Sequence, residues 1–198
     1  MTRQIRMATP DDAEACAGIY APVVRDTVIS FETEPPTVNQ MRSRIVEYLP
    51  FAPWLCYEEN GQVLGYAYAS RFRPRPAYRW AVEGSCYLAP EARGKGAGFA
   101  LASLLNDLLR LQGFQSVYDV IALPNPASER LSEKLGRRRV GVLPGAGYKL
   151  GRWVDVAYWR QELIAPEPVP AEPRTVAECE QMPEWQAVMA RGMVLTVS

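Results

Sequence analysis

The 198-residue sequence contains no histidine. This absence excludes Ser-His-Asp and Cys-His catalysis, and it excludes every metal site that depends on imidazole ligands. Proton transfer near neutral pH must therefore use a carboxylate with a raised pKa, a perturbed tyrosine, lysine or cysteine, or water. We expect no metal ion.

Three further absences bear on location and partners. No run of about 18 apolar residues occurs, so no membrane span is expected, and the amino-terminal segment has no apolar signal-peptide centre. The formal net charge is zero, which argues against nucleic-acid binding. The four cysteines are scattered without a C-x-x-C pair and are interpreted as reduced, packed thiols. These features favour a cytoplasmic protein with no nucleic-acid or membrane partner.

Hydrophobic periodicity and turn signals predict one mixed α/β domain over residues 1–163. The expected order is β-α-α-β-β-β-α-β-α-β-β, a mixed sheet with helices on its faces. Strands are expected at 5–7, 79–90, 116–123, 138–143 and 153–163. A hairpin is expected at 54–72, with its turn at Asn60-Gly61. Helices are expected at 9–24, 97–112 and 125–136, and another helix begins at Thr37.

The composition changes after Leu163. Residues 164–174 have a proline at almost every second position and are expected to form an extended linker. Residues 175–198 form a C-terminal tail, which could contain a short amphipathic helix around Trp185, Val188 and Met189. A frayed tail, or a segment docked on the core or on a partner subunit, are the alternatives.

A glycine-rich loop, "ARGKGAG", lies where a strand gives way to a helix. Free backbone N–H groups and the helix dipole create an anion site at a helix N-terminus. Glycines allow close approach and unusual backbone angles there, and Arg93 and Lys95 add positive charge. We interpret the loop as a pyrophosphate site; a tight turn without a ligand is the alternative. Neither the P-loop pattern nor G-x-G-x-x-G is present.

The spacing Arg93-x-x-Gly96-x-Gly98 resembles the acetyl-CoA loop of the GNAT acetyltransferase superfamily, and the element order is similar to that fold. Several segments resemble the phosphinothricin acetyltransferase family within it: "YAPVVRDTVISFETEP", "LGYAYASRFRPRPAYRWAVEGSCYLAPEARGKGAG", "LPNPAS" and "GYKLGRWVDVAYWRQEL". The resemblance implies a splayed strand pair that binds acetyl-CoA, and transfer of its acetyl group to the α-amino group of a small amino-acid-like acceptor. It also implies a homodimer paired through the C-terminal strands.

Glu83 is the candidate catalytic residue. A carboxylate inside the apolar strand "RWAVEGSCYL" is unusual, and burial would raise its pKa toward that of a general base. A salt bridge to Arg79 is the alternative. Strand alternation places Glu83 on the face opposite Cys86, which we interpret as a packed thiol and not as a nucleophile. The resemblance gives a glutamate at this position the role of base, through water.

The resemblance also indicates the cofactor-binding residues. Backbone N–H groups near Tyr87 and Leu88 could hold the oxyanion of the reaction. Asn125 could act only as a helix cap, or could touch the cofactor as well. The expected set is Cys86, Tyr87, Leu88, Arg93, Gly94, Lys95, Gly96, Ala97, Gly98, Asn125 and Ser128.

Acceptor binding is assigned to an arginine-rich stretch, "SRFRPRPAYR". Guanidinium groups bind carboxylates and phosphinates through paired hydrogen bonds, although a solvated basic loop is the alternative. We favour Arg73 and Arg75, with Phe31, Tyr78 and Lys149 as pocket walls.

The sequence departs from the family pattern at Ser132, where the family often has a ring donor that protonates the departing thiolate, and at Arg137, where it has an aromatic residue. Serine is a weak acid, so water or another tyrosine could serve instead. Leu150 and Val154 replace family histidines. Two other functions therefore stay open: acetylation of another amine, such as a polyamine or a peptide N-terminus, and a non-catalytic CoA-binding module.

Overall fold

A seven-stranded mixed sheet forms the centre of the molecule, in the order β1-β2-β3-β4-β5-β7-β6. The computed structural model describes residues 2–193. Only β4 and β5 pair in parallel, and all other neighbours are antiparallel. The strands are β1 (Arg3–Met7), β2 (Trp54–Glu59), β3 (Gln62–Arg71), β4 (Ala81–Leu88), β5 (Ser116–Ala122), β6 (Arg138–Lys149) and β7 (Arg152–Glu162).

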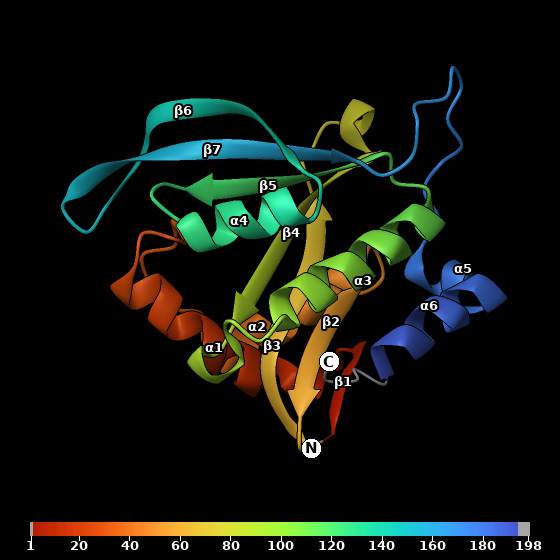
Figure 1. Ribbon diagram of the computed structural model, residues 1–198, viewed down its shortest axis with the longest axis horizontal. Helices are drawn as coiled ribbons and strands as arrows, with labels where there is room; N and C mark the ends of the chain where they lie inside the picture. The colour runs from red at the N-terminus through yellow and green to blue at the C-terminus, as the bar shows by residue number, and fades with distance from the viewer. Residues whose placement is uncertain (1, 194–198) are drawn as a thin grey trace.

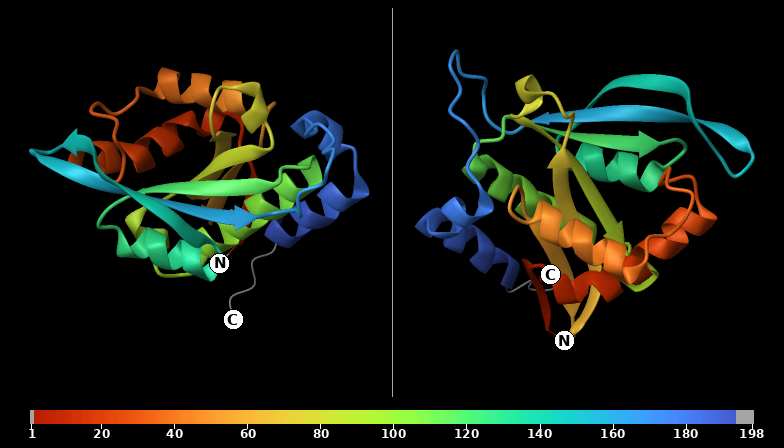
Figure 2. Two further views of the ribbon diagram at one scale, coloured as in Figure 1. Left: turned by 90° about the horizontal axis from the view of Figure 1, so that it is seen from above. Right: turned by 180° about the vertical axis from the view of Figure 1, so that it is seen from behind.

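Helices cover both faces of the sheet, as Figures 1 and 2 show. On one face α1 and α2 pack over Trp54, Cys56 and Tyr66. On the other face α3 packs over Leu55 and Ala67, with α4 beside it. The helices are α1 (Ala13–Asp26), α2 (Val38–Tyr48), α3 (Ala97–Gln112) and α4 (Pro126–Lys134). This arrangement confirms the predicted fold class and element order.

The local signals in the sequence act where they were expected. Asn60 and Gly61 have φ values of 51° and 81°, the left-handed pair that a tight primed hairpin turn requires. Gly113 ends α3 with a φ of 94°. The Thr37 side chain accepts a hydrogen bond from the backbone N–H of Gln40, which closes a capping box at the start of α2.

Strands β4 and β5 separate soon after they meet. Their ladder contains three pairs, Ala81 with Ser116, Val82 with Val117 and Glu83 with Tyr118, and beyond these pairs the strands diverge (Figure 1). On its other edge β4 stays paired with β3 as far as Leu88. The edge of β4 that faces β5 therefore has no ladder partner from Gly84 onward among the described residues. This is the splayed strand pair that the sequence predicted.

The chain after residue 163 returns to the core. Helices α5 (Val176–Glu180) and α6 (Pro183–Met193) lie beside α3 and β1 (Figures 1 and 2). Trp185 is 2% exposed and belongs to the same hydrophobic cluster as the inner face of α3. The connecting segment is held by hydrogen bonds such as Trp80 Nε1 to the carbonyl of Ala171, at 2.7 Å. Residues 194–198 of the predicted tail lie outside the described range, and the division at residue 163 stays a prediction.

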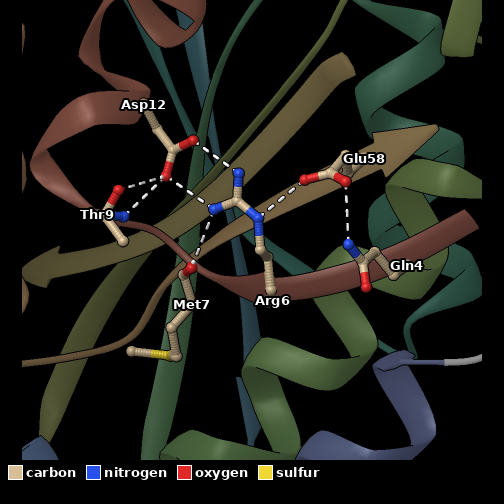
Figure 3. A network of polar contacts seen from close by, with 6 residues as sticks. All are labelled: Gln4, Arg6, Met7, Thr9, Asp12 and Glu58. Carbon is tan, nitrogen blue, oxygen red and sulfur yellow. Dashed lines mark hydrogen bonds and ion pairs between the residues drawn. The ribbon is translucent and has the colours of Figure 1, made fainter. Parts of the chain in front are cut away.

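A polar network fixes the start of the chain to the sheet (Figure 3). The Arg6 guanidinium donates to both carboxylate oxygens of Asp12 at 2.8 Å, to Glu58 at 2.9 Å and to the Met7 carbonyl at 3.2 Å. Burial alone would raise the pKa of Asp12, but hydrogen bonds from Arg6 and Thr9 outweigh it and lower that pKa. One side chain thus joins β1, β2 and the entry to α1.

Replacing Arg6 by methionine is expected to destabilise the protein by about 2 to 3 kcal/mol at pH 7, because a buried carboxylate loses its partner. Because the pKa of Asp12 is lower in the folded protein than in the unfolded chain, its ionised form stabilises the fold above the ordinary pKa of Asp. This stabilisation is lost as the pH falls through the folded-state pKa of Asp12. The deficit should therefore shrink as pH falls toward that range. Urea unfolding at several pH values measures it.

Arg25→Met is the matched control, because Arg25 forms a similar two-point ion pair with Asp26 on the exposed surface. Exposed pairs contribute little to stability, so this variant should unfold close to the wild type. Equal losses for the two variants, or a loss for Arg6→Met that does not change with pH, would contradict the assignment.

Candidate active site

The separation of β4 and β5 opens into a pocket of about 80 Å³. Its walls come from the splayed part of β4, from β5, from the middle of α3 and from α4. Four of the expected cofactor residues line it: Cys86, Tyr87, Asn125 and Ser128. Asn125 also caps α4, since its side chain accepts a hydrogen bond from the backbone N–H of Ser128 at 3.2 Å. The two roles considered for Asn125 are therefore compatible.

The glycine-rich loop leads from the end of β4 into α3. Gly94 and Gly96 have φ values of 72° and 84°, which side chains rarely tolerate, and Gly96 is the residue that precedes the first turn of α3. Arg93 donates from Nε to the carbonyl of Leu88 at 3.1 Å and so holds the loop against the strand. Gly98 packs closely against the strand, since a Cβ there would lie 3.3 Å from the Leu88 side chain. The exposed loop thus presents the N-terminus of α3, an arrangement that suits an anion.

Glu83 occupies the last pair of the β4–β5 ladder. Burial raises the pKa of its carboxyl group, the nearby charge of Asp119 raises it further, and Arg73 partly opposes the shift. Within residues 2–193, Glu83 forms no hydrogen bond or ion pair, and Arg79, its alternative partner, pairs with Glu172 instead. A half-buried carboxylate with a raised pKa and no fixed partner is suited to take a proton.

The two faces of β4 have different surroundings. Tyr87 contacts the α1 side, where its ring centroid lies 4.8 Å from that of Tyr20, whereas Cys86 packs with the α3 side. Burial raises the pKa of the Cys86 thiol to about 12, so this group stays protonated and is a poor nucleophile. This agrees with its interpretation as a packed thiol.

Arg73 lies on an aromatic surface next to Glu83. Its guanidinium donates to the carbonyl of Phe72 at 2.7 Å and to the hydroxyl of Tyr158 at 3.0 Å. The Phe72 ring stacks on Tyr118, the ladder partner of Glu83, with centroids 4.2 Å apart. Arg73 therefore brings positive charge to the neighbourhood of the carboxylate.

The other predicted acceptor residues are dispersed. Tyr78 is exposed and meets Phe72 edge-on, whereas the Arg75 side chain forms no hydrogen bond or ion pair within residues 2–193. Lys149 is buried and donates from Nζ to the carbonyls of Val24 and Ser30, both at 2.6 Å. Phe31 packs against Gly147 of β6. Lys149 and Phe31 thus join β6 to the segment after α1, and the Lys149 amine is already occupied by the backbone.

Sequence reasoning missed Asp119 and the buried position of Arg137 at the pocket, and Asn106, which accepts a hydrogen bond from Arg137. Asp119 and Arg137 form a buried ion pair, and the Ser132 hydroxyl donates to the same carboxylate at 2.6 Å. The available signal was an aspartate in the apolar strand "SVYDVIAL", which resembles the signal that identified Glu83.

A splayed strand pair, a glycine-rich helix entry and an unpaired half-buried carboxylate define an acyltransferase site for an extended, phosphate-bearing acyl carrier. The chain belongs to the GNAT acetyltransferase family, whose domain matches residues 5–158. The predicted family is thus confirmed, and with it the prediction of an acyl-CoA N-acyltransferase enzyme.

Individual relatives agree with this assignment. The chain is 37% identical to phosphinothricin N-acetyltransferase from Streptomyces viridochromogenes over 90% of its length and 96% of that protein. It is 34% identical to the L-methionine sulfoximine/L-methionine sulfone acetyltransferase of Salmonella typhimurium, over 80% and 94% of the two chains. A crystal structure of a phosphinothricin acetyltransferase from Sinorhizobium meliloti in complex with AcCoA superimposes with a TM-score of 0.81 at 38% identity, covering 87% and 96% of the chains.

Within residues 2–193 no helix is long and apolar enough to cross a membrane. In the same range no cluster of acidic and cysteine side chains could hold a metal ion.

Replacing Glu83 by glutamine is expected to lower kcat about 10²- to 10⁴-fold, the usual contribution of a general base. The base acts in its ionised form, so the wild-type rate should fall as pH drops through the raised pKa of Glu83. In the variant this break should move up to the pKa of the acceptor amine, which must then lose its proton without a base. Steady-state rates from pH 5 to pH 9 measure both effects.

Stability provides an independent readout for the same variant. A carboxyl group whose folded-state pKa is raised destabilises the native protein above that pKa. Glu83→Gln should therefore melt at or above the wild-type temperature at pH 7.5. A variant that melts lower, or whose acid limb stays at the wild-type pH, would exclude Glu83 as the base.

Proposed function

We propose that the chain transfers an acetyl group from acetyl-CoA to the α-amino group of a small, acidic, amino-acid-like acceptor of the phosphinothricin, methionine sulfoximine or methionine sulfone type. One observation carries this proposal: a half-buried, unpaired Glu83 at the end of the β4–β5 ladder with the Arg73 guanidinium near it. A base next to a cation suits a molecule that has both an amine and an acidic group.

The residues present fit acetyl-CoA. The free edge of β4 from Gly84 to Leu88 offers backbone groups to an extended arm, and the loop from Arg93 to Gly98 offers the N-terminus of α3 to a pyrophosphate. The pocket between β4 and β5 lies beside this edge. When bound, acetyl-CoA supplies the activated acetyl group. Backbone N–H groups near Tyr87 and Leu88 are assigned to the reacting carbonyl oxygen.

On the acceptor side, each residue has a separate task. An α-amine is largely protonated at pH 7 and must lose a proton before it can attack. Glu83 takes that proton, through water, because its raised pKa brings it nearer to the pKa of the amine. Arg73 orients the acceptor by binding its acidic group through charge-assisted hydrogen bonds.

The other functions are less well supported. A polyamine would meet the positive charge of Arg73 where it needs a negative group. A non-catalytic CoA-binding module would not require a carboxylate that is kept half-buried without a partner, because this arrangement only destabilises the fold.

We further propose that the chain is a cytoplasmic homodimer joined through β6 and β7. These two strands end the sheet and carry large exposed apolar side chains. Exposed apolar side chains that gather on one part of a protein often mark an interface. The side chains are Val140, Leu143, Tyr148, Leu150 and Trp153, the last of which is 70% exposed.

Light scattering is expected to give the mass of two chains for the wild type and of one chain for Trp153→Glu, because a charge would be buried at the centre of the apolar contact. A wild-type mass of one chain at micromolar concentration would reject the dimer.

A thiol-release assay with acetyl-CoA tests the acceptor. Phosphinothricin, methionine sulfoximine and methionine sulfone should exceed spermidine in kcat/KM by about 10- to 100-fold, the effect of one charged hydrogen bond gained or lost. Ordinary amino acids complete the panel. Turnover on spermidine alone would keep the fold and reject the proposed acceptor.

Two arginine variants sharpen this assay. Arg73→Ala should raise the acceptor KM about 10- to 100-fold, whereas Arg75→Ala, the matched control on the same loop, should change it by no more than about twofold. The opposite result would move the acceptor site to the outer part of the loop.

A further inference from the structure

A buried polar cluster lies at the point where β4 and β5 separate, and the proposed mechanism does not use it. It consists of Asn106 from α3, Asp119 from β5, Ser132 from α4 and Arg137, which follows α4. All four residues are at most 9% exposed. They lie on the α3 side of the sheet, whereas Glu83 faces the other side.

The cluster is organised around Asp119. The Arg137 guanidinium donates from Nη1 to Asp119 Oδ2, and the Ser132 hydroxyl donates to the same oxygen at 2.6 Å. Arg137 Nη2 donates to Asn106 Oδ1 at 3.3 Å. The carboxylate thus fixes the positions of one hydroxyl group and one guanidinium group.

The cluster borders the pocket at the point where β4 and β5 begin to separate. The β4–β5 ladder ends at Glu83 and Tyr118, so Gly84 and Asp119 are the first residues beyond it. A Cβ at Gly84 would lie 3.3 Å from Asp119 Oδ1 and 3.6 Å from Arg137 Nη2. Asp119, Ser132 and Arg137 all line the pocket, together with the Cys86 thiol.

The guanidinium has hydrogen-bonding capacity to spare. Arg137 Nε is buried and has no hydrogen-bond partner within residues 2–193. An unsatisfied buried donor is destabilising. Arg137 lines the pocket, and its Nη1 and Nη2 groups each have one N–H beyond those used on Asp119 and Asn106, so the guanidinium can donate to an anion there.

We propose that Arg137, held in place by Asp119 with the Ser132 hydroxyl fixing that carboxylate, stabilises the sulfur anion of CoA as it leaves. This inference rests on the proposed acetyl transfer. In the reaction the C–N bond forms as the C–S bond breaks, and the C–S electron pair goes to sulfur. Glu83 takes the proton from the amine, and sulfur later receives a proton from solvent, so the products are the N-acetyl acceptor and free CoA thiol.

The chemistry of the cluster favours stabilisation over proton donation. The Ser132 hydroxyl has a single proton, which it donates to Asp119 Oδ2, so it positions the ion pair and does not donate to the sulfur anion. A guanidinium keeps its charge throughout and binds anions through several N–H groups. In a site shielded from water this interaction is stronger than in solvent. Arg137 can thus stabilise the leaving group without supplying a proton.

Other titrating groups near the pocket do not account for the effect. The Cys86 thiol, on β4, has a pKa raised to about 12 by burial and stays neutral. Burial raises the pKa of Asp119, on β5, and Arg137 and Ser132 oppose the shift. Asn106 of α3 and Ser132 of α4 are neutral, and Glu83 lies on the opposite face of β4.

Binding of CoA and of desulfo-CoA, which lacks the thiol, tests the inference without an acceptor. If the site favours the sulfur anion, the pKa of the bound thiol is lowered, and CoA gains affinity over desulfo-CoA as pH rises. Calorimetry should give a preference for CoA that increases about fivefold from pH 6.5 to 9.5 for a pKa lowered by about one unit. Titration of protein groups affects both ligands and cancels in the ratio.

Variants separate this role from simple packing. Arg137→Gln should abolish the pH-dependent preference, and Ser132→Ala should reduce it by about half. Asp119→Asn removes a negative charge and leaves the guanidinium, so this variant should begin to prefer CoA over desulfo-CoA at a lower pH than the wild type. A structural role predicts the same loss for Arg137→Gln and Asp119→Asn.

The double variant Asp119→Asn/Arg137→Gln contains no buried charge and covers the case in which Arg137→Gln alone does not fold. It should bind CoA and desulfo-CoA alike at every pH. A flat ratio in the wild type, or a pH-dependent ratio in the double variant, would overturn the inference. If the wild type binds neither nucleotide, the acetyl-CoA site is rejected as well. If the CoA to desulfo-CoA affinity ratio rises with pH but no acceptor in the panel is acetylated, only the proposed acceptor is rejected.

Discussion

The separation of β4 from β5 is the constraint on which the rest of the site depends. Three ladder pairs join the strands, and the backbone of β4 beyond them has no partner on that edge. Unpaired backbone groups inside a sheet are destabilising unless a ligand or solvent satisfies them. Strand β3, paired with β4 up to Leu88, keeps the free edge straight. The fold thus maintains an open strand edge, and every assigned group lies along it or at its ends.

Strand alternation then places the group that takes a proton and the group that stabilises the leaving anion on opposite faces of the sheet. Glu83 and Tyr87 face α1, whereas Gly84 and Cys86 face α3. If the carboxylate that takes a proton formed an ion pair with the cation that stabilises an anion, each would neutralise the charge of the other. The sheet lies between Glu83 and Arg137, and Asp119 pairs with Arg137. The raised pKa of Glu83 is therefore preserved next to a buried guanidinium.

Much of this could be predicted from the sequence, because it depends on local signals. The Asn60-Gly61 turn, the Thr37 cap and the end of α3 at Gly113 each follow from a few neighbouring residues. The site of Glu83 follows from strand alternation. Arg137 and Lys149 could not be placed in this way, since their partners lie 18 to 125 positions away in the chain. Both residues have long side chains that are usually solvated, and only the folded chain shows that they are buried.

Two of the carboxylate–arginine pairs in residues 2–193, Arg6 with Asp12 and Arg137 with Asp119, show what such an interaction requires. Arg6 makes four hydrogen bonds with its five guanidinium N–H groups, to Asp12, Glu58 and the Met7 carbonyl, and the pKa of Asp12 is lowered. Within residues 2–193 Arg137 Nε has no partner, and burial raises the pKa of Asp119. A pair that only holds elements together gains by satisfying every donor. The pair at the pocket leaves more guanidinium N–H groups unused among the described residues, which agrees with a second role for Arg137 beside the ion pair.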